Sequence, residues 1–390
     1  MDTCSMNYKW GSVICIRDTR MRLWGSIKDA TIGGNGGNES RRGSSSSSTP
    51  VHSFSSHSPL TSSPIVNRAS RHHHSDPRIR AISSHRAFNA NMGKNRYSDV
   101  PCVDDSRIRL RLGCNQHGDY LHANRVVYPF ICTQGPTQHT THDFWRMVFQ
   151  ERAEHIVMLC KPVEECKPKC SVYWPEKIGE VKRFACVIVT NEGKDTEDEF
   201  GMMTLKVELN PKYDAASDGF GGDECMPLTV KMLRWTEWPD RGIPLKDGKT
   251  ASTAPLRILE RVRNRTCVVH CSAGIGRTGS LIAIQMALQR LYTGKYVSVD
   301  QIVRELRCLR SNSIQTDMQY LFIHRVIVEA SLQLGSSLSS VPPIKPGIGC
   351  MVPPSKESLT IPPSAKLAAL SFQRKCDRVL EAKERKNTDV

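Results

Sequence analysis

The sequence lacks long apolar runs. The longest apolar run near its N-terminus, Val13–Ile16, is far shorter than the core of a secretory signal peptide. No segment approaches the roughly 18 consecutive apolar residues that a membrane-spanning helix needs. We therefore expect a soluble, cytoplasmic protein, with the nucleus as the alternative location.

Paired cysteines are also missing. The chain has 15 cysteines, an odd number, and no C-x-x-C pair at the spacing of zinc ligands. A secreted disulfide scaffold would be compact and would contain an even number of cysteines. Reduced thiols in an intracellular compartment fit this composition better, and the sequence has no internal repeats.

Acidic residues are scarce at the two ends of the chain. Residues 1–90 contain 12 Lys/Arg against five Asp/Glu, and residues 334–390 contain nine against five. These flanks therefore carry most of the net charge of +15, and the middle is close to balanced. We expect no nucleic-acid partner, whereas the basic flanks could contact an acidic protein or a membrane surface.

Composition divides the chain into three parts. Residues 1–86 are basic and rich in Ser and Gly, and we predict that they are disordered because they lack apolar periodicity. Residues 87–334 are predicted to form one folded domain. Residues 335–390 are predicted to form a basic tail rich in Pro and Ser. Within the tail, residues 365–386 are weakly amphipathic, and we favour a frayed charged segment over a partner-binding or membrane-surface helix.

The middle part alternates short apolar runs with amphipathic stretches. The predicted strands are Val126–Thr133, His155–Leu159, Arg183–Val189, Thr204–Leu209, Leu228–Trp235 and Cys267–His270. The predicted helices are Thr141–Arg152, Thr253–Val262, Thr278–Tyr292, Asp300–Arg310 and Thr316–Ala330. Strands come first and helices gather late, which predicts an α/β domain with a mixed sheet.

The most informative segment is 268–280, VVHCSAGIGRTGS. An apolar strand leads into Cys271, small residues follow, and Arg277 opens a helical pattern. Backbone N–H groups of such a loop and the helix N-terminus together attract anions, which favours the thiolate form of the cysteine. Arg277 adds a planar fork suited to phosphate. The segment therefore predicts a nucleophile placed inside a phosphate site.

A dinucleotide site is the competing interpretation of the same segment. Gly274, Gly276 and Gly279 spell G-x-G-x-x-G, and Asp300 lies 26 residues after Gly274. However, Asp300 precedes an amphipathic pattern and is predicted to be a helix N-cap, not the end of a second strand. No further βαβ units follow, so we favour the phosphate site.

The signature H-C-x5-R-[ST] and its flanks resemble the phosphotyrosine-specific protein tyrosine phosphatases of the non-receptor type. The similarity runs from residue 94 to about residue 330. The matching segments, in the order of the family, are Lys94–Tyr97, Asp119–Asn124, Thr133–Pro136, Asp143–Trp145, Lys169–Cys170, Tyr173–Pro175, Trp238–Asp240, Gln315–Thr316 and Gln319–Tyr320. The resemblance implies a mixed, highly twisted sheet flanked by helices.

The resemblance also implies roles for single residues. Cys271 is the nucleophile, Arg277 the phosphate clamp, and Asp240 the general acid and base. Thr278 assists breakdown of the phosphocysteine, and His270 helps to set the environment of the thiolate. Other residues hold the water or the substrate, and Glu164 occupies the place of the acid that orients the arginine. The water is positioned by Gln315 and Gln319, and the substrate is bound by Tyr97, Asp99, Ser272, Ala273, Gly274, Ile275 and Gly276.

Two departures from the family pattern bear on specificity. The family segment D-Y-I-N-A-N is DYLHAN here, with His122 in place of Asn, which we expect to alter a supporting hydrogen bond. Asn312 stands where many members have Gly, and a larger side chain there could narrow the entrance of the pocket.

The sequence thus predicts an enzyme, a protein-tyrosine-phosphatase, that removes phosphate from phosphotyrosine-containing proteins as a monomer, without a metal or organic cofactor. Two other functions stay open. One is a phosphotyrosine-binding module with weak catalysis, and the other is a phosphatase that accepts phosphoserine or lipid phosphate.

Overall fold

The computed structural model describes residues 84–195, 200–246, 249–293 and 295–337, together with residues 367, 370, 371, 373–380 and 382. All but the last three residues of the predicted N-terminal region, 1–86, and much of the predicted tail, 335–390, therefore lie outside the described residues.

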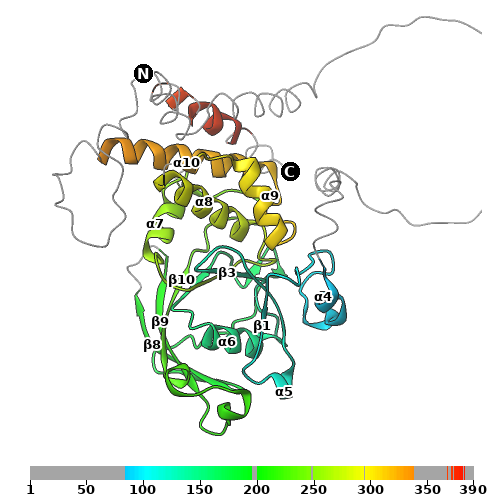
Figure 1. Cartoon of the computed structure of the whole chain (residues 1–390). Coiled ribbons are helices and arrows are strands. Elements are labelled where there is room, and N and C mark those ends of the chain that lie inside the picture. Colours follow the sequence, from blue (N-terminus) through cyan, green and yellow to red (C-terminus); the bar gives the residue numbers. More distant parts are fainter. Residues whose placement is uncertain are drawn as a thin grey trace, which may run out of the picture. The chain divides into compact units, whose positions relative to one another are not determined.

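A nine-stranded mixed sheet forms the centre of the domain (Figure 1), in the order β1-β2-β3-β13-β4-β10-β9-β8-β7. The four strands β3, β13, β4 and β10 are parallel to one another, and the outer pairs are antiparallel. The strands are β1 (Arg107–Arg109), β2 (Tyr120–Arg125), β3 (Phe130–Thr133), β4 (His155–Met158), β7 (Val181–Phe184), β8 (Val187–Asp195), β9 (Met202–Leu209), β10 (Leu228–Arg234) and β13 (Cys267–His270). The prediction of an α/β fold with a mixed sheet is confirmed.

Two small antiparallel pairs lie outside this sheet. They are β5 (Val163–Glu164) with β6 (Lys167–Pro168), and β11 (Leu245–Lys246) with β12 (Lys249–Thr250). The first pair places Glu164 and the segment that follows Lys167 near the carboxyl ends of the parallel strands, where the candidate site lies.

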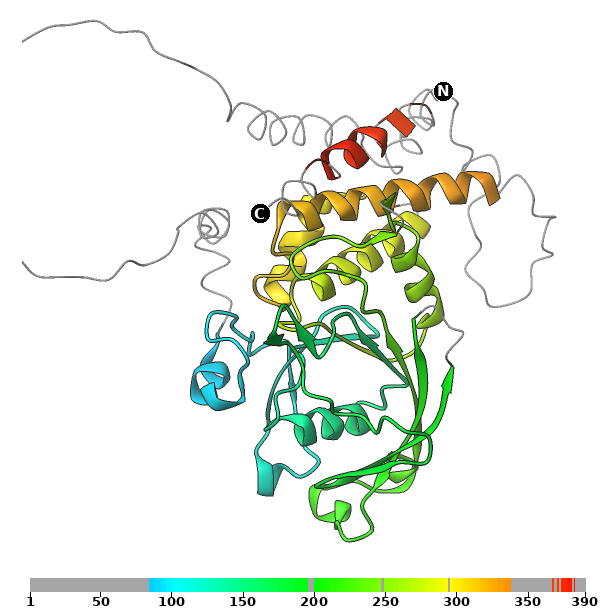
Figure 2. The same cartoon turned by 180° about the vertical axis from the view of Figure 1, so that it is seen from behind.

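The longer helices lie on both faces of the sheet, with α7 to α10 gathered on one face and α6 on the other (Figures 1 and 2). They are α6 (Thr141–Gln150), α7 (Ala254–Arg261), α8 (Arg277–Tyr292), α9 (Val299–Leu309) and α10 (Asp317–Ser337). The short elements are α4 (Arg86–Ala90), η1 (Met92–Lys94), α5 (Cys114–His117), η2 (Ala215–Asp218) and η3 (Gly222–Cys225). Helix α8 contacts α7, α9, α10 and β13, so it is apolar on nearly every side.

Three sequence predictions of local structure were wrong. The strand predicted at 126–133 begins only at Phe130, because a turn with a cis Tyr128–Pro129 bond precedes it. The single strand predicted at 183–189 is the end of β7 and the start of β8, separated by a turn. Helix α9 is capped by Ser298, whose side chain accepts a hydrogen bond from the N–H of Gln301, and Asp300 lies inside the first turn.

Strand β2 was not predicted at all. Five of its six residues are buried, including His122 and Asn124, so it shows neither polar alternation nor an apolar run. Sequence patterns detect strands through apolar residues, and they miss a strand whose buried side chains are polar and hydrogen-bonded.

The prediction of a frayed segment near the C-terminus was also wrong for the residues that the structure describes. Residues 373–380 are helical, and Cys376 and Leu380 are buried. Asp377 pairs with Arg325 of α10 at 2.8 Å, and Gln373 donates to Glu329 of α10 at 2.9 Å. This helix therefore packs against α10 (Figure 2).

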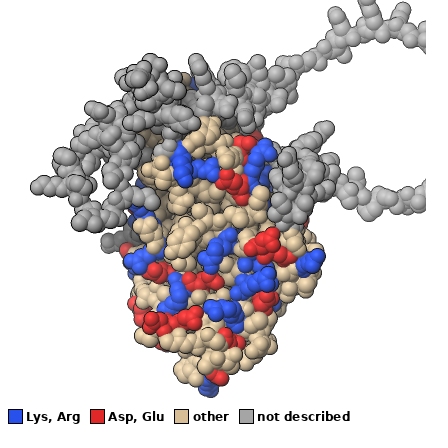
Figure 3. All heavy atoms as spheres, in the orientation of Figure 1, with Lys and Arg blue, Asp and Glu red and all other residues tan. Residues whose placement is uncertain are grey.

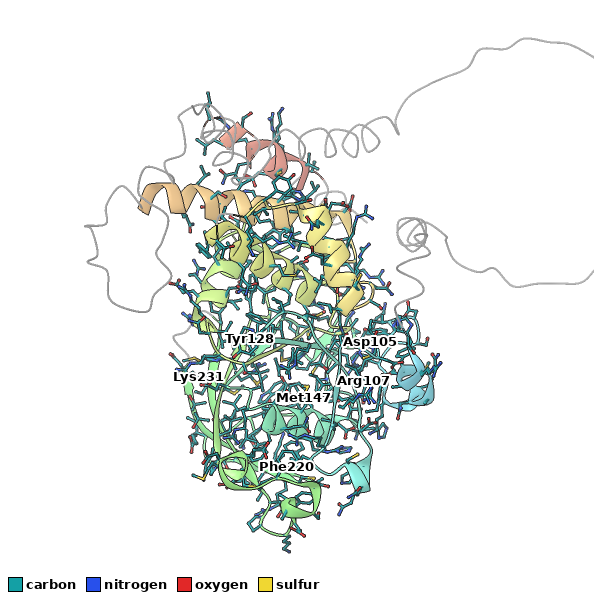
Figure 4. The ribbon with its side chains drawn as sticks, in the orientation of Figure 1. Asp105, Arg107, Tyr128, Met147, Phe220 and Lys231 are labelled. Atoms are coloured by element: carbon teal, nitrogen blue, oxygen red, sulfur yellow. The ribbon has the colours of Figure 1, made fainter. Side chains whose placement is uncertain are left out.

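Charges on the domain surface are mixed. On the face drawn in Figure 3, basic and acidic side chains are interspersed, as the near-balanced charge of the middle part leads one to expect. A groove of about 540 Å³ is lined by residues of β1, the β2–β3 turn and the end of α9. Asp105, Arg107 and Tyr128, which line it, are labelled in Figure 4, and none of the predicted site residues does so. In the described parts, no helix is long and apolar enough to cross a bilayer.

Replacing Leu380 tests the packing of the C-terminal helix. Leu380→Ala removes a fully buried side chain and should lower the free energy of unfolding by about 2–5 kcal/mol, measured by urea denaturation. The exposed Arg378 is the matched control, and Arg378→Ala should change the free energy of unfolding by no more than about 0.5 kcal/mol. Equal stability of the Leu380→Ala and wild-type proteins would show that this helix is not packed on the domain.

Candidate active site

The candidate site lies at the carboxyl end of β13, in the middle of the parallel strands. β13 is flanked by β3 and β4, and all four of its residues are buried. The chain leaves β13 at His270, passes through a loop of residues 271–276, and enters α8 at Arg277. The predicted strand–loop–helix arrangement is therefore present, and the N-terminus of α8 faces the loop.

The carbonyl groups of this loop are bound from outside it. The oxygen of Ser272 accepts from the N–H of Gly135 (2.8 Å), and the oxygen of Ile275 accepts from the N–H of Ile314 (2.9 Å). The oxygens of Ala273 and Gly274 accept from Arg310 at 3.0 Å. Among the described residues, no N–H group of residues 272–276 donates to a protein acceptor. Because the two ends of a peptide group point in opposite directions, these N–H groups face inward, as an anion cradle requires.

Close packing explains the glycines of the loop. Gly274 has φ of +69°, and a Cβ there would lie 2.0 Å from the carbonyl oxygen of Thr133. A Cβ on Gly276 would lie 2.3 Å from Oε1 of Gln315. Neither position accepts a side chain without a shift of the surrounding structure.

Arg277 is held from the far side by Glu164. The two side chains form a bidentate pair, with Nη1–Oε1 at 2.6 Å and Nη2–Oε2 at 3.0 Å. Nη1 also donates to the carbonyl oxygen of Trp238 (3.0 Å), and Nη2 donates to Oδ1 of Asp240 (3.1 Å). The guanidinium is only 1% exposed, so its plane is fixed before any ligand arrives.

Asp240 lies between two cations. Its Oδ2 accepts from Nζ of Lys169 at 2.6 Å, and its Oδ1 accepts from Arg277. Burial raises the pKa of the Asp240 carboxyl, but the hydrogen bond from Lys169 and the charge of Arg277 outweigh it and hold the pKa below its ordinary value. The carboxylate form is therefore favoured in the ligand-free protein.

The segment that carries Asp240 is closed over the loop. Trp238 is fully buried, packs against the rings of Trp235 and Phe322, and donates from Nε1 to the carbonyl oxygen of Gly242 at 3.0 Å. This packing, together with the bond from Arg277 to the Trp238 carbonyl, keeps the carboxyl of Asp240 next to the arginine.

His270 and Thr278 lie on either side of the loop and are fully buried. His270 Nδ1 is 3.1 Å from the carbonyl oxygen of Cys271, and Nε2 is 2.7 Å from the hydroxyl of Tyr173. Burial lowers the pKa of His270 to about 4, so the ring is neutral at physiological pH and acts by hydrogen bonding only. The hydroxyl of Thr278 has no partner within the described part of the chain.

Gln315 and Gln319 meet beside Gly276, at the opposite edge of the loop. Oε1 of Gln319 accepts from the backbone N–H of Gln315 at 3.0 Å, which orients its amide. Nε2 of Gln319 is buried and has no protein partner among the described residues. A donor is thus directed toward the start of α8, next to Arg277.

Tyr97 and Asp99 form the rim of the site. The hydroxyl of Tyr97 is 2.8 Å from Oγ of Ser272, and its ring packs on a cluster formed by Val100, Ala273 and Ile275. Asp99 is exposed, and its carbonyl oxygen accepts from Nδ2 of Asn312 at 3.3 Å. The structure therefore brings all the predicted site residues to one end of the sheet.

Sequence reasoning assigned no role to Lys169, and it did not notice Arg310. Lys169 belongs to a segment that matched the family, which was a usable signal. Arg310 follows an ordinary amphipathic helix, and only the folded chain shows that it reaches the loop of Cys271. No pattern in the sequence could have revealed that contact.

The family model described as protein-tyrosine phosphatase matches residues 91–329, well over half of the chain. The chain belongs to the protein-tyrosine phosphatase family. A solved structure from "Structural basis of PTPN18 fingerprint on distinct HER2 tyrosine phosphorylation sites" superimposes with a TM-score of 0.57 at 27% identity. It covers 68% of this chain and 92% of that one.

Several curated relatives are similar over the same region. They are phosphatidylinositol phosphatase PTPRQ of Homo sapiens (33% identity, 63% of this chain, 10% of the relative), receptor-type tyrosine-protein phosphatase eta of Gallus gallus (33%, 61% and 17%) and tyrosine-protein phosphatase 69D of Drosophila melanogaster (33%, 61% and 16%). The chain thus spans less than a fifth of the length of these relatives.

The ion pair between Lys169 and Asp240 leads to a prediction about pH. Lys169→Met removes the cation that stabilises the carboxylate, so the pKa of Asp240 should rise. A general acid with a higher pKa keeps its proton to higher pH, so the alkaline limb of the kcat/KM profile should move up by on the order of one pH unit. The exposed Lys167 is the control, and Lys167→Met should leave the profile in place. An alkaline limb that does not move in Lys169→Met would contradict this role.

Proposed function

We propose that this chain hydrolyses phosphotyrosine in proteins through a phosphocysteine intermediate. The observation that carries the proposal is the loop of residues 271–276, whose carbonyls are bound outside and whose N–H groups remain available around Cys271. A dianionic phosphate fits this arrangement, because Arg277 supplies a fork of donors at the same place.

In the first step, Sγ of Cys271 attacks phosphorus and the bond from phosphorus to the aryl oxygen breaks. The loop N–H groups and Arg277 stabilise the equatorial oxygens, which carry the negative charge of the transition state. Asp240 donates its proton to the departing phenolate oxygen, so tyrosine leaves as the neutral phenol. The sulfur then carries the phosphoryl group.

Asp240 needs a proton for this step, although its surroundings favour the carboxylate before substrate binds. The substrate brings two negative charges to within reach of Arg277 and competes for its Nη2 donor. Both effects raise the pKa of the carboxyl. The arrival of the phosphate thus favours the protonated, neutral form of Asp240. Proton donation is thereby confined to the occupied site.

In the second step, water attacks the phosphocysteine. Gln315 and Gln319 lie beside the loop and can hold this water, and Asp240, now a carboxylate, takes its proton. The bond between phosphorus and sulfur breaks, the thiolate of Cys271 is restored, and phosphate leaves. The Thr278 hydroxyl stands at the start of α8, where it can donate to the departing sulfur.

Phosphotyrosine proteins are the proposed substrates because of the rim. Tyr97 is fixed by its contact with Ser272 and sets a distance between the rim and Cys271 that suits an aryl phosphate better than the shorter phosphoserine. Asp99 can accept hydrogen bonds from the substrate backbone. A relative at 33% identity bears the name phosphatidylinositol phosphatase, so lipid phosphate is the second candidate substrate.

We also propose that the protein is of the non-receptor type and acts as a monomer, without a metal or cofactor. Its proposed location is the cytoplasm, with the nucleus as the alternative. The 12 cysteines among the described residues are free thiols, which supports a reducing compartment. The basic flanks remain candidates for contact with an acidic partner or a membrane surface. Fractionation of cells that express the natural gene product tests the location and the type.

Substrate profiling of two variants tests the proposed function. Wild-type protein should release phosphate from phosphotyrosine peptides in a vanadate-sensitive reaction that EDTA does not inhibit. Cys271→Ser should abolish turnover but retain substrate binding, and Asp240→Ala should slow it by about 10²–10⁴-fold. Phosphoserine peptides and phosphoinositide vesicles are the comparison substrates. Turnover by Cys271→Ser, or a preference for either comparison substrate, would overturn the proposal.

Asn312 leads to a prediction about peptide selectivity. Its φ of 60° is one that Gly adopts without strain, so Asn312→Gly should fold normally while it removes a side chain from the rim beside Asp99. The variant should gain up to about tenfold in kcat/KM toward peptides with bulky residues next to phosphotyrosine, as expected for relief of one steric contact of about 1.4 kcal/mol. Turnover of para-nitrophenyl phosphate, which does not extend to the rim, is the control. Unchanged rates across the peptide panel would show that Asn312 does not select substrates.

A further inference from the structure

Arg310 lies behind the loop of residues 271–276 and is almost completely buried (1% exposed). It follows the last residue of α9. Its Nε donates to the carbonyl oxygen of Gly274 and its Nη2 to that of Ala273, both at 3.0 Å. Its Nη1 is 2.7 Å from Oδ1 of Asn124 and 3.0 Å from Nδ1 of His122. In the described part of the chain, its hydrogen bonds thus all go to neutral acceptors.

This contact fixes the direction of two peptide groups. The N–H groups of Gly274 and Ile275 belong to the same peptide planes as the two carbonyls that Arg310 binds, and they point the opposite way. A guanidinium can bind neighbouring carbonyls with two donors held in one plane, which an ammonium group cannot do. Burying the cation is costly, and the cost is offset only while all its donors stay bound.

His122 completes the set of acceptors, and its tautomer follows from its partners. Nε2 is 2.8 Å from the carbonyl oxygen of Val100, which can only accept, so Nε2 carries the proton. Nδ1 is then the acceptor for Arg310. Burial, with the nearby charge of Arg310, lowers the pKa of His122 to about 3, so the ring stays neutral at any pH used for assay.

The partner of Nε2, Val100, belongs to the segment of residues 97–100, which carries the rim residues Tyr97 and Asp99 and is called the recognition loop below. Val100 lies three residues after Tyr97, and its side chain packs with Tyr97, Ala273 and Ile275 in one buried cluster. The imidazole of His122 therefore has one nitrogen on the loop that sets the rim and the other on the arginine that sets the cradle. A second link joins the rim to the loop of residues 271–276, because the hydroxyl of Tyr97 lies next to Oγ of Ser272.

We propose that His122 is a positioning residue that couples the phosphate cradle to the recognition loop, through Arg310 on one side and Val100 on the other. The proposal deepens the proposed function and rests on it for the meaning of the rim. His122 touches no substrate in this arrangement. Its effect is to hold the distance between Tyr97 and Cys271, and hence the depth of the pocket.

Two substitutions separate the two halves of this coupling. Asn places an amide oxygen near the position of Nδ1, so His122→Asn keeps the acceptor for Arg310 and loses the donor to Val100. Gln extends further, so His122→Gln keeps a donor near Val100 and loses the acceptor for Arg310. His122→Asn should therefore raise KM for a phosphotyrosine peptide about tenfold with little change in vanadate affinity. His122→Gln should weaken vanadate binding about tenfold, since a hydrogen bond to a charged group contributes on the order of 1.5–3 kcal/mol.

The measurements are kcat, KM, the Kd of vanadate and the melting temperature for each variant. His155 is the matched control, because it is also a buried histidine but lies at the opposite end of β4 from the site. His155→Ala should lower the melting temperature and leave KM and vanadate affinity unchanged.

Opposite patterns in His122→Asn and His122→Gln support the coupling. If both variants only melt earlier, as His155→Ala does, or if KM and vanadate affinity change together in both, the positioning role is wrong. Should the wild-type protein bind vanadate yet fail to turn over phosphotyrosine, the proposed function fails, and vanadate affinity still decides whether His122 supports the cradle.

Discussion

The site depends on the direction of a few peptide groups. A peptide plane presents its carbonyl to one side and its N–H to the other, so a loop can surround an anion with donors only if its carbonyls are satisfied elsewhere. Here the loop carbonyls accept hydrogen bonds from the backbone N–H groups of Gly135 and Ile314 and from the guanidinium of Arg310. Gly135 follows β3, whereas Arg310 and Ile314 both belong to the connection between α9 and α10. The cradle around Cys271 is therefore a product of the whole domain.

The charges around the cradle follow from the same constraint. A ring of inward N–H groups attracts anions of any kind, including the carboxylates of the protein itself. Glu164 and Asp240 both approach Arg277, but Glu164 binds it from the far side, and Lys169 gives Asp240 a second partner. The carboxylate of Asp240 is thus stabilised beside the arginine. The segment that carries Asp240 is thereby held next to Arg277, where the proposed mechanism needs a proton donor.

The extent to which the sequence predicts this molecule depends on how local each feature is. The strand, the glycine loop and the helix around Cys271 are contiguous, and their pattern was sufficient to predict these elements and their order. β2 was missed because its buried positions include His122 and Asn124, which look like surface residues until their partners are known. The helix near the C-terminus was missed for a related reason, since its stability comes from contacts with α10, such as that between Asp377 and Arg325.

The failure to predict β2 and the proposed coupling share one physical origin. Burying His122, Asn124 and Arg310 together costs desolvation free energy that an apolar core would avoid. A prediction that assigns apolar residues to the core therefore places these three side chains on the surface. Polar groups that are fully hydrogen-bonded in a buried site have few alternative arrangements, whereas apolar side chains can repack. A phosphate cradle needs that restriction, because a rotation of one peptide plane replaces a donor with an acceptor. The polar interior behind the loop is therefore best understood as the means by which the fold keeps the amides of the loop directed at phosphorus.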